Sequence, residues 1–176
     1  MDRTVVIYKS KYGATKQYAQ WIAEELQCDI IRAEDFKKKD FEKYDNIIFG
    51  GGMHGGGIKG LELIKKNKLR LEGKKIVIFA VGLNVDNSAA RIEIRDLNLE
   101  KDWERGLTVY YCMGAFDPSK VTGIDKMEIR ISLDMLESSR AEWTDELARL
   151  YHDMTNGADH IDRKYIEPIV AEFKCS

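Results

Sequence analysis

The sequence predicts an α/β protein whose doubly wound parallel sheet has five strands in the order 2-1-3-4-5, with a helical insertion after strand five. Three observations lead to this prediction. Continuous β-branched and aromatic runs alternate with helical segments, the runs are apolar enough to be buried on both faces, and a long segment follows the last run. A chain of 176 residues, 44% hydrophobic and 33% charged, suits a single domain over residues 1–176.

The first strand is predicted at residues 4–8, where β-branched and aromatic side chains follow one another without a break. Apolar residues then recur at helical spacing from Tyr18 to Leu26, which predicts an amphipathic helix over residues 15–27. The same alternation continues, with helical stretches between further strands at residues 29–31, 46–49, 75–80 and 107–113. Right-handed crossovers between such strands give a parallel sheet that is covered on both faces.

The segment after strand five is longer than a minimal five-stranded domain needs. Asp117 before Pro118 indicates a helix start, and apolar residues from Trp143 to Met154 fall on one helical face. Pro168 indicates that the final helix begins shortly before it, over about residues 165–173. Residues 127–136 are apolar on most sides, which favours core packing beside strand five over contact with a partner or a membrane surface.

Charge and cysteine content bear on partners and location. The chain has 28 Lys+Arg and 30 Asp+Glu, and a net charge of −2 gives no field that would attract nucleic acid. The N-terminal residues do not resemble a secretory signal, so we expect a cytoplasmic protein. Cys28, Cys112 and Cys175 are far apart and do not cluster with histidines at metal-ligand spacing, so we expect reduced thiols and no metal.

The loop after strand one has the composition of a phosphate site. Its six residues carry a hydroxyl at each end and a glycine, and a helix N-terminus follows, so backbone N–H groups and the helix dipole favour an anion there. The alternative is that a hydroxyl simply caps the helix and the glycine only serves the turn. The residues are Ser10, Lys11, Tyr12, Gly13, Ala14 and Thr15.

Two further loops are expected at the same edge of the sheet. Residues 50–57 contain six glycines, which favours close contact with a flat cofactor over a mobile linker. Residues 81–88 bring a glycine, apolar side chains and amides to that edge, and a flavin ring needs apolar faces and a few polar groups at its rim. The residues expected to contact the cofactor are Gly51, Gly52, Met53, His54, Gly55, Gly82, Leu83 and Asn84.

Residues 10–15 resemble the phosphate loop of flavodoxins, Thr/Ser-x-Thr-Gly-x-Thr, with Tyr12 in place of the central hydroxyl residue. The chain as a whole resembles the flavodoxin-domain family that includes bacterial quinone-dependent protoporphyrinogen oxidases. This resemblance lies in residues 8–15, 49–60, 114–120 and 157–173. The glycine loop departs from that oxidase group, which tends to carry bulkier residues there.

The resemblance implies that the cofactor is flavin mononucleotide (FMN). Residues 10–15 would hold its phosphate, residues 53–55 would flank the ring near N5, and residues 82–84 would line the pyrimidine side. For His54, a place on the flavin face is one alternative, and a merely exposed side chain in a loop is the favoured one. The resemblance also implies an FMN-dependent oxidoreductase that oxidises a porphyrinogen-like substrate and reduces a quinone, with no dedicated acid or base. The alternatives are an electron carrier between redox partner proteins and a binding module without turnover. Peripheral membrane contact and a homodimer stay open.

Overall fold

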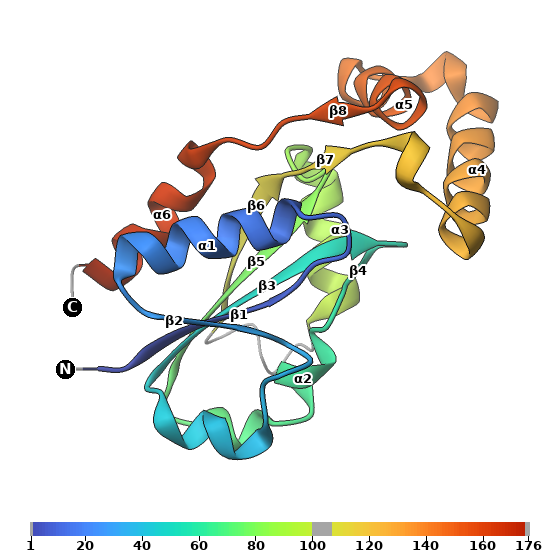
Figure 1. The fold of residues 1–176 in the computed structure, drawn as a ribbon. Helices are drawn as coiled ribbons and strands as arrows, with labels where there is room; N and C mark the ends of the chain where they lie inside the picture. The colour runs from blue at the N-terminus through green and yellow to red at the C-terminus, as the bar shows by residue number, and fades with distance from the viewer. Residues whose placement is uncertain (1, 100–106, 175–176) are drawn as a thin grey trace.

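The computed structural model describes residues 2–99 and 107–174, and its centre is a parallel sheet (Figure 1). The five parallel strands follow the predicted order, with one short antiparallel strand added beside the third of them. In order along the chain, the strands of this sheet are β1 (Thr4–Lys9), β2 (Asp29–Arg32), β3 (Asn46–His54), β4 (Gly57–Ile58), β5 (Lys75–Gly82) and β6 (Leu107–Met113). Their spatial order is β2-β1-β3-β5-β6, and β4 pairs with β3.

Side chains of β1 alternate between two buried layers, which explains its uninterrupted apolar sequence. Val5 and Ile7 belong to the core on one face of the sheet, and Val6 and Tyr8 to the core on the other. The helix predicted after this strand is α1 (Ala14–Leu26), which covers the second face together with the C-terminal helix α6 (Glu167–Lys174). Both helices were predicted to within a few residues.

The glycine run after the third strand is largely not a loop, which corrects the sequence prediction. β3 continues through residues 50–54, and a turn at Gly55 and Gly56 leads into β4. The glycines are needed because neighbours approach closely. A Cβ on Gly50 would lie 2.0 Å from Cζ of Phe79, and a Cβ on Gly51 would lie 2.5 Å from Cγ2 of Ile58.

The connections on the other face are shorter than the helical stretches predicted there. Between β2 and β3 lies the 3-10 helix η1 (Lys38–Lys43), and between β4 and β5 lie α2 (Glu62–Lys65) and η2 (Lys68–Leu71). The helix α3 (Ser88–Asn98) follows β5. Each of these elements contributes at least one residue to the core on this face, namely Phe41, Ile64, Leu71 and Ile94.

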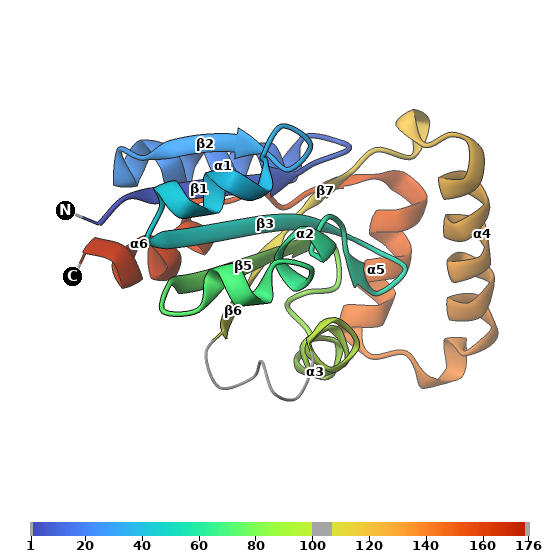
Figure 2. The ribbon, with the colours of Figure 1, turned by 90° about the horizontal axis from the view of Figure 1, so that it is seen from below.

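The predicted insertion after the fifth parallel strand is present and lies beyond the carboxyl ends of the strands (Figures 1 and 2). It is bounded by two short strands, β7 (Ala115–Phe116) and β8 (Ala158–Asp159), which pair antiparallel and return the chain to the sheet. Between them lie η3 (Pro118–Lys120), α4 (Gly123–Ser138), η4 (Arg140–Glu142) and α5 (Asp145–Asn156), and after them η5 (Arg163–Ile166) precedes α6.

The expectation that residues 127–136 pack in the core is wrong. They belong to α4, which packs against α5 at the outer end of the insertion (Figure 2). Large apolar side chains of this helix are exposed to solvent. Their alternating apolar pattern is weakly amphipathic, so the sequence did not distinguish core from surface. The exposed fractions are 71% for Ile124, 60% for Met127, 50% for Ile131 and 67% for Met135.

Two of the three cysteines lie in the described part of the chain, and both are free thiols. Burial raises the pKa of Cys112 to about 12 and that of Cys28 to about 11. Cys175 lies outside the described residues. Among the helices described, none has the length and apolar character needed to cross a bilayer.

Candidate functional site

The loop between β1 and α1 presents a helix N-terminus that no side chain caps in the described structure. Gly13 has φ +105°, and its backbone N–H donates to Oγ of Ser10 at 3.2 Å. Thr15 lies inside the first helical turn, so neither hydroxyl caps α1 and the capping alternative is not realised. The first turn also lacks acidic side chains, so its N–H groups and the helix dipole together favour an anion.

Strand register brings the second and third loops next to the first. Lys9 at the end of β1 pairs with Gly51 of β3, and Gly52 pairs with Val81 of β5. The hydroxyl of Thr15 lies 3.4 Å from the position that a Cβ on Gly52 would occupy. The carboxyl ends of β1, β3 and β5 therefore form one rim, as the sequence predicts for a ligand site in such a sheet.

The tip of the β3–β4 hairpin carries Met53, His54 and Gly55. A Cβ on Gly82 would lie 3.0 Å from Cβ and Cγ of Met53, so a glycine at residue 82 lets this side chain lie against β5. The hairpin is fixed by the buried Asn98 of α3, which accepts from the N–H of Ile58 and donates to the carbonyl of Gly56, both at 2.8 Å. The tip is therefore held in place by α3 as well as by the sheet.

The third loop contains a side-chain amide, that of Asn84, whose oxygen has no hydrogen-bond partner among the described residues. Oδ1 of Asn84 is buried and has no hydrogen-bond partner in the described structure, which is uncommon because burying an unpaired acceptor costs free energy. The adjacent carbonyl of Leu83 accepts from Nη2 of Arg149 at 3.4 Å. The same Nη2 donates to Oδ1 of Asp86 at 2.8 Å, and this bond lowers the pKa of Asp86.

The insertion is also attached to the first loop, through Asp125 near the start of α4. Oδ2 of this carboxylate accepts from Nζ of Lys11 and from the hydroxyl of Tyr12, and only 7% of the residue is exposed. These hydrogen bonds, the one from Lys11 first, hold the pKa of Asp125 below its usual value. Oδ1 faces Nε2 of His54 at 3.6 Å.

Asp125 and Arg149 are residues of the site that the sequence analysis did not identify. Both lie far along the chain from the loops they contact, on helices of the insertion. Neither stands in a glycine-rich loop or next to a strand end, which were the signals used to find site residues. Only the return of the chain through β7 and β8 brings them back to the rim.

A protein-family model matches most of the chain, and several solved structures are similar to it. The model of the family described as "Flavodoxin domain" matches residues 5–142. Similar solved structures include a flavodoxin from the domain Archaea, at 20% identity and a TM-score of 0.44 over 78% of this chain and 99% of that one. Flavodoxin 2 from Bacillus cereus matches at 20% identity and a TM-score of 0.47, over 72% of this chain and 91% of the other.

A further similar structure is a Lactobacillus acidophilus flavoprotein in complex with FMN, with 16% identity, a TM-score of 0.41, and coverage of 64% of this chain and 93% of that one. A search of curated protein sequences finds no significant match. The family model covers most of the chain, including the first loop, the hairpin and the third loop. The chain therefore belongs to the flavodoxin domain family.

Proposed function

We propose that this chain binds FMN at the rim formed by residues 10–15, 51–55 and 82–84, and acts as an FMN-dependent oxidoreductase. The observation that carries the proposal is that one rim presents both hydrogen-bond donors and a hydrogen-bond acceptor that have no partner among the described residues. The uncapped first turn of α1 offers N–H groups that suit a phosphate. The buried Oδ1 of Asn84 offers an acceptor that suits the imide N–H of a flavin ring.

The other residues of the rim fit the same cofactor. In the proposed complex, residues 10–15 hold the phosphate, residues 53–55 flank the ring near N5 with His54 on its face, and residues 82–84 line its pyrimidine side. Met53 supplies apolar surface, and the absence of a side chain at Gly82 gives it room. FMN supplies the electron-transfer chemistry, while the chain binds and orients it.

The position of the insertion favours an enzyme over an electron carrier. Asp125 attaches α4 to the first loop, and Arg149 attaches α5 to the third loop, so the insertion lies beside the proposed cofactor. Such a wall can hold a substrate against a flavin, whereas a carrier needs an open cofactor edge for its partners. The resemblance noted in the sequence leads us to propose a porphyrinogen-like electron donor and a quinone as electron acceptor. We also propose that the protein itself is cytoplasmic.

The exposed apolar side of α4 supports a further part of this proposal, contact with a redox partner or with a membrane surface that contains the quinone. Large exposed apolar patches commonly mark such contacts. Self-association through this helix would give a homodimer instead. Sedimentation with quinone-containing vesicles, compared with the mass of the protein in solution, separates these two arrangements.

The experiment that tests the proposed function starts with the visible spectrum of purified protein after FMN is added. An anaerobic assay with protoporphyrinogen IX and a menaquinone analogue follows. We expect FMN uptake and quinone-dependent oxidation. Uptake without turnover would favour the carrier, and absence of uptake would overturn the proposal.

A further inference from the structure

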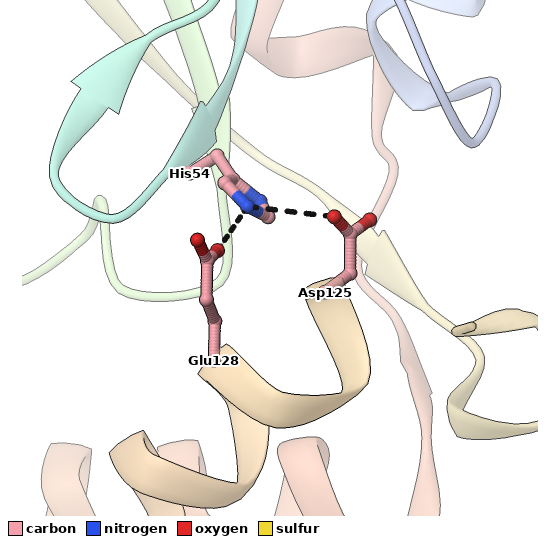
Figure 3. A group of neighbouring side chains, drawn as sticks. All are labelled: His54, Asp125 and Glu128. Carbon is pink, nitrogen blue, oxygen red and sulfur yellow. Dashed lines mark ion pairs between the residues drawn. The ribbon is translucent and has the colours of Figure 1, made fainter. Parts of the chain in front are cut away.

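We propose that His54, Asp125 and Glu128 form a binding site for a first-row divalent transition-metal ion, with Zn²⁺ as the reference case. One ligand atom from each residue lies within 4.8 Å of the others. Figure 3 shows the imidazole of His54 pointing between the two carboxylates. The inference goes beyond the proposed function and does not require FMN to be bound.

The ligand types match such an ion. Zn²⁺ binds histidine nitrogen and carboxylate oxygen at about 2.0–2.2 Å, which separates neighbouring ligand atoms by about 3–4 Å. Nε2 of His54 lies 3.6 Å from Oδ1 of Asp125, which is within this range. Its direct contact with Oε2 of Glu128 is shorter than this range, so an ion enters only after these two atoms move apart. A mixed nitrogen and oxygen set favours Zn²⁺ or Mn²⁺ over Mg²⁺ and Ca²⁺, which prefer oxygen alone.

The ligands come from two elements that are fixed independently of a metal. His54 ends β3, and its pairing with Gly57 in the hairpin sets the position of its backbone. Asp125 and Glu128 are three residues apart on α4, a spacing that places both side chains on one side of a helix. No metal site was predicted from the sequence, which could not bring these residues together because β3 and α4 are distant along the chain.

A second set of contacts orients the central carboxylate. Lys11 and Tyr12 both bind Oδ2 of Asp125, which leaves Oδ1 turned toward His54. Hydrogen bonds of this kind, from residues that do not touch the metal, orient ligands in many metal sites. The ammonium of Lys11 offsets one of the two carboxylate charges, so Lys11, Asp125 and Glu128 together keep a net charge of −1 that attracts a cation.

The site is also partly open. The exposed fractions of the side chains are 23% for His54, 10% for Asp125 and 45% for Glu128. An ion therefore has a path from solvent, and water can complete its coordination. Three protein ligands with an open position are typical of a metal that can be exchanged or that takes part in chemistry.

The test is calorimetric titration of the full chain with Zn²⁺ after chelator treatment and dialysis, together with the absorption spectrum of the Co²⁺ complex. We expect one ion per chain and the intense visible absorption bands that are typical of a four-coordinate Co²⁺ centre. His54→Gln and Glu128→Gln should each lower affinity more than ~10-fold, because even loss of a second-sphere contact costs about 10–100-fold.

His152→Gln is the matched control, because His152 is largely exposed, pairs with Asp153 at 3.7 Å, and belongs to no group of three possible ligands among the described residues. This variant should keep the affinity and the Co²⁺ bands. Circular dichroism checks that each variant is folded. Failure to bind one ion, or unchanged binding in a folded His54→Gln variant, would overturn the proposal. Neither result depends on flavin, so the outcome is separate from that of the proposed function.

Discussion

Asn84 has a buried side-chain oxygen that no described residue hydrogen-bonds, and this oxygen supports the proposed FMN site most directly. A buried acceptor without a partner lowers the stability of the protein alone and gains a hydrogen bond only when a donor arrives. Asn84→Ala should therefore weaken FMN binding roughly tenfold, the worth of one hydrogen bond. The same change should not lower the melting temperature of the flavin-free protein.

Asn87, in the same loop, provides the matched control for this prediction. Its side chain accepts from the N–H of Ala90 at 3.0 Å and caps α3. Asn87→Ala should cost about 1 kcal/mol of stability and change FMN affinity less than Asn84→Ala does. Fluorescence titration and thermal unfolding measure both variants. If Asn84→Ala destabilises the flavin-free protein as much as Asn87→Ala, the amide has a structural role and the assignment is wrong.

Gly13 permits a test of charge at the phosphate loop. No atom lies within 4 Å of a Cβ built on this glycine, so a side chain has room, although φ +105° strains any residue with a Cβ. Gly13→Asp should abolish FMN binding because its carboxylate would face the phosphate. Gly13→Ala carries the same backbone strain without the charge and should still bind. Equal FMN affinity of the two variants would count against a phosphate at this loop.

The position of a residue at the rim was predictable from sequence only where a local pattern indicated it. Ser10, Gly13 and Thr15 stand in a loop between a strand and a helix, and such a loop has a known relation to the edge of the sheet. Asp125 has no local signal, because its significance comes from Lys11 and Tyr12 on another element. The alternative that Ser10 caps the helix could be rejected only from the structure, in which its hydroxyl accepts from the N–H of Gly13, the residue before the helix.

At the scale of elements, the attachment of α4 to the first loop through Asp125 is open to test. Asp125→Ala removes the acceptor of Lys11 and Tyr12, so hydrogen exchange of the α4 amides should become faster. Asp134→Ala, an exposed residue on the same helix, should leave exchange unchanged. Equal exchange in both variants would show that Asp125 does not hold the helix.

The same attachment predicts a pH dependence. The pKa of Asp125 is lowered in the folded protein by its bonds to Lys11 and Tyr12, so the ionised form is the one that the fold stabilises. Its contribution is complete above the unfolded pKa of about 4 and is lost as pH falls through the folded value. Protection of α4, corrected for intrinsic exchange rates, should fall in acid in the original chain, and Asp125→Ala should lack this step.

Strands were predictable from the sequence where a whole run of consecutive residues is buried. Residues 4–8 were predicted as a strand and lie within β1, because a strand buried on both faces tends to be apolar at every position, and Val5 to Tyr8 are all buried. The prediction ended β3 too early because glycine has a low intrinsic preference for strands. What places Gly50 in the strand is its contact with Phe79, which belongs to a neighbouring strand.

For the whole molecule, the strand order and the insertion followed from the alternation of elements and the length of the chain, and both are present in the structure. The placement of the insertion could not be predicted, because it depends on the short β7–β8 ladder and on ion pairs between distant residues. In the proposed FMN complex, that placement would put a wall beside the edge of the cofactor. It is also the reason for preferring an enzyme.

We propose that main-chain amides at the start of α1 bind the phosphate of FMN. The most direct test titrates flavin-free protein with FMN and, in parallel, with riboflavin, which has the same ring without the phosphate. We predict one FMN per chain and binding of riboflavin weaker by ~100-fold, since charge-assisted hydrogen bonds contribute about 1.5–3 kcal/mol each. Equal affinity for the two flavins, or no binding of either, would contradict the account.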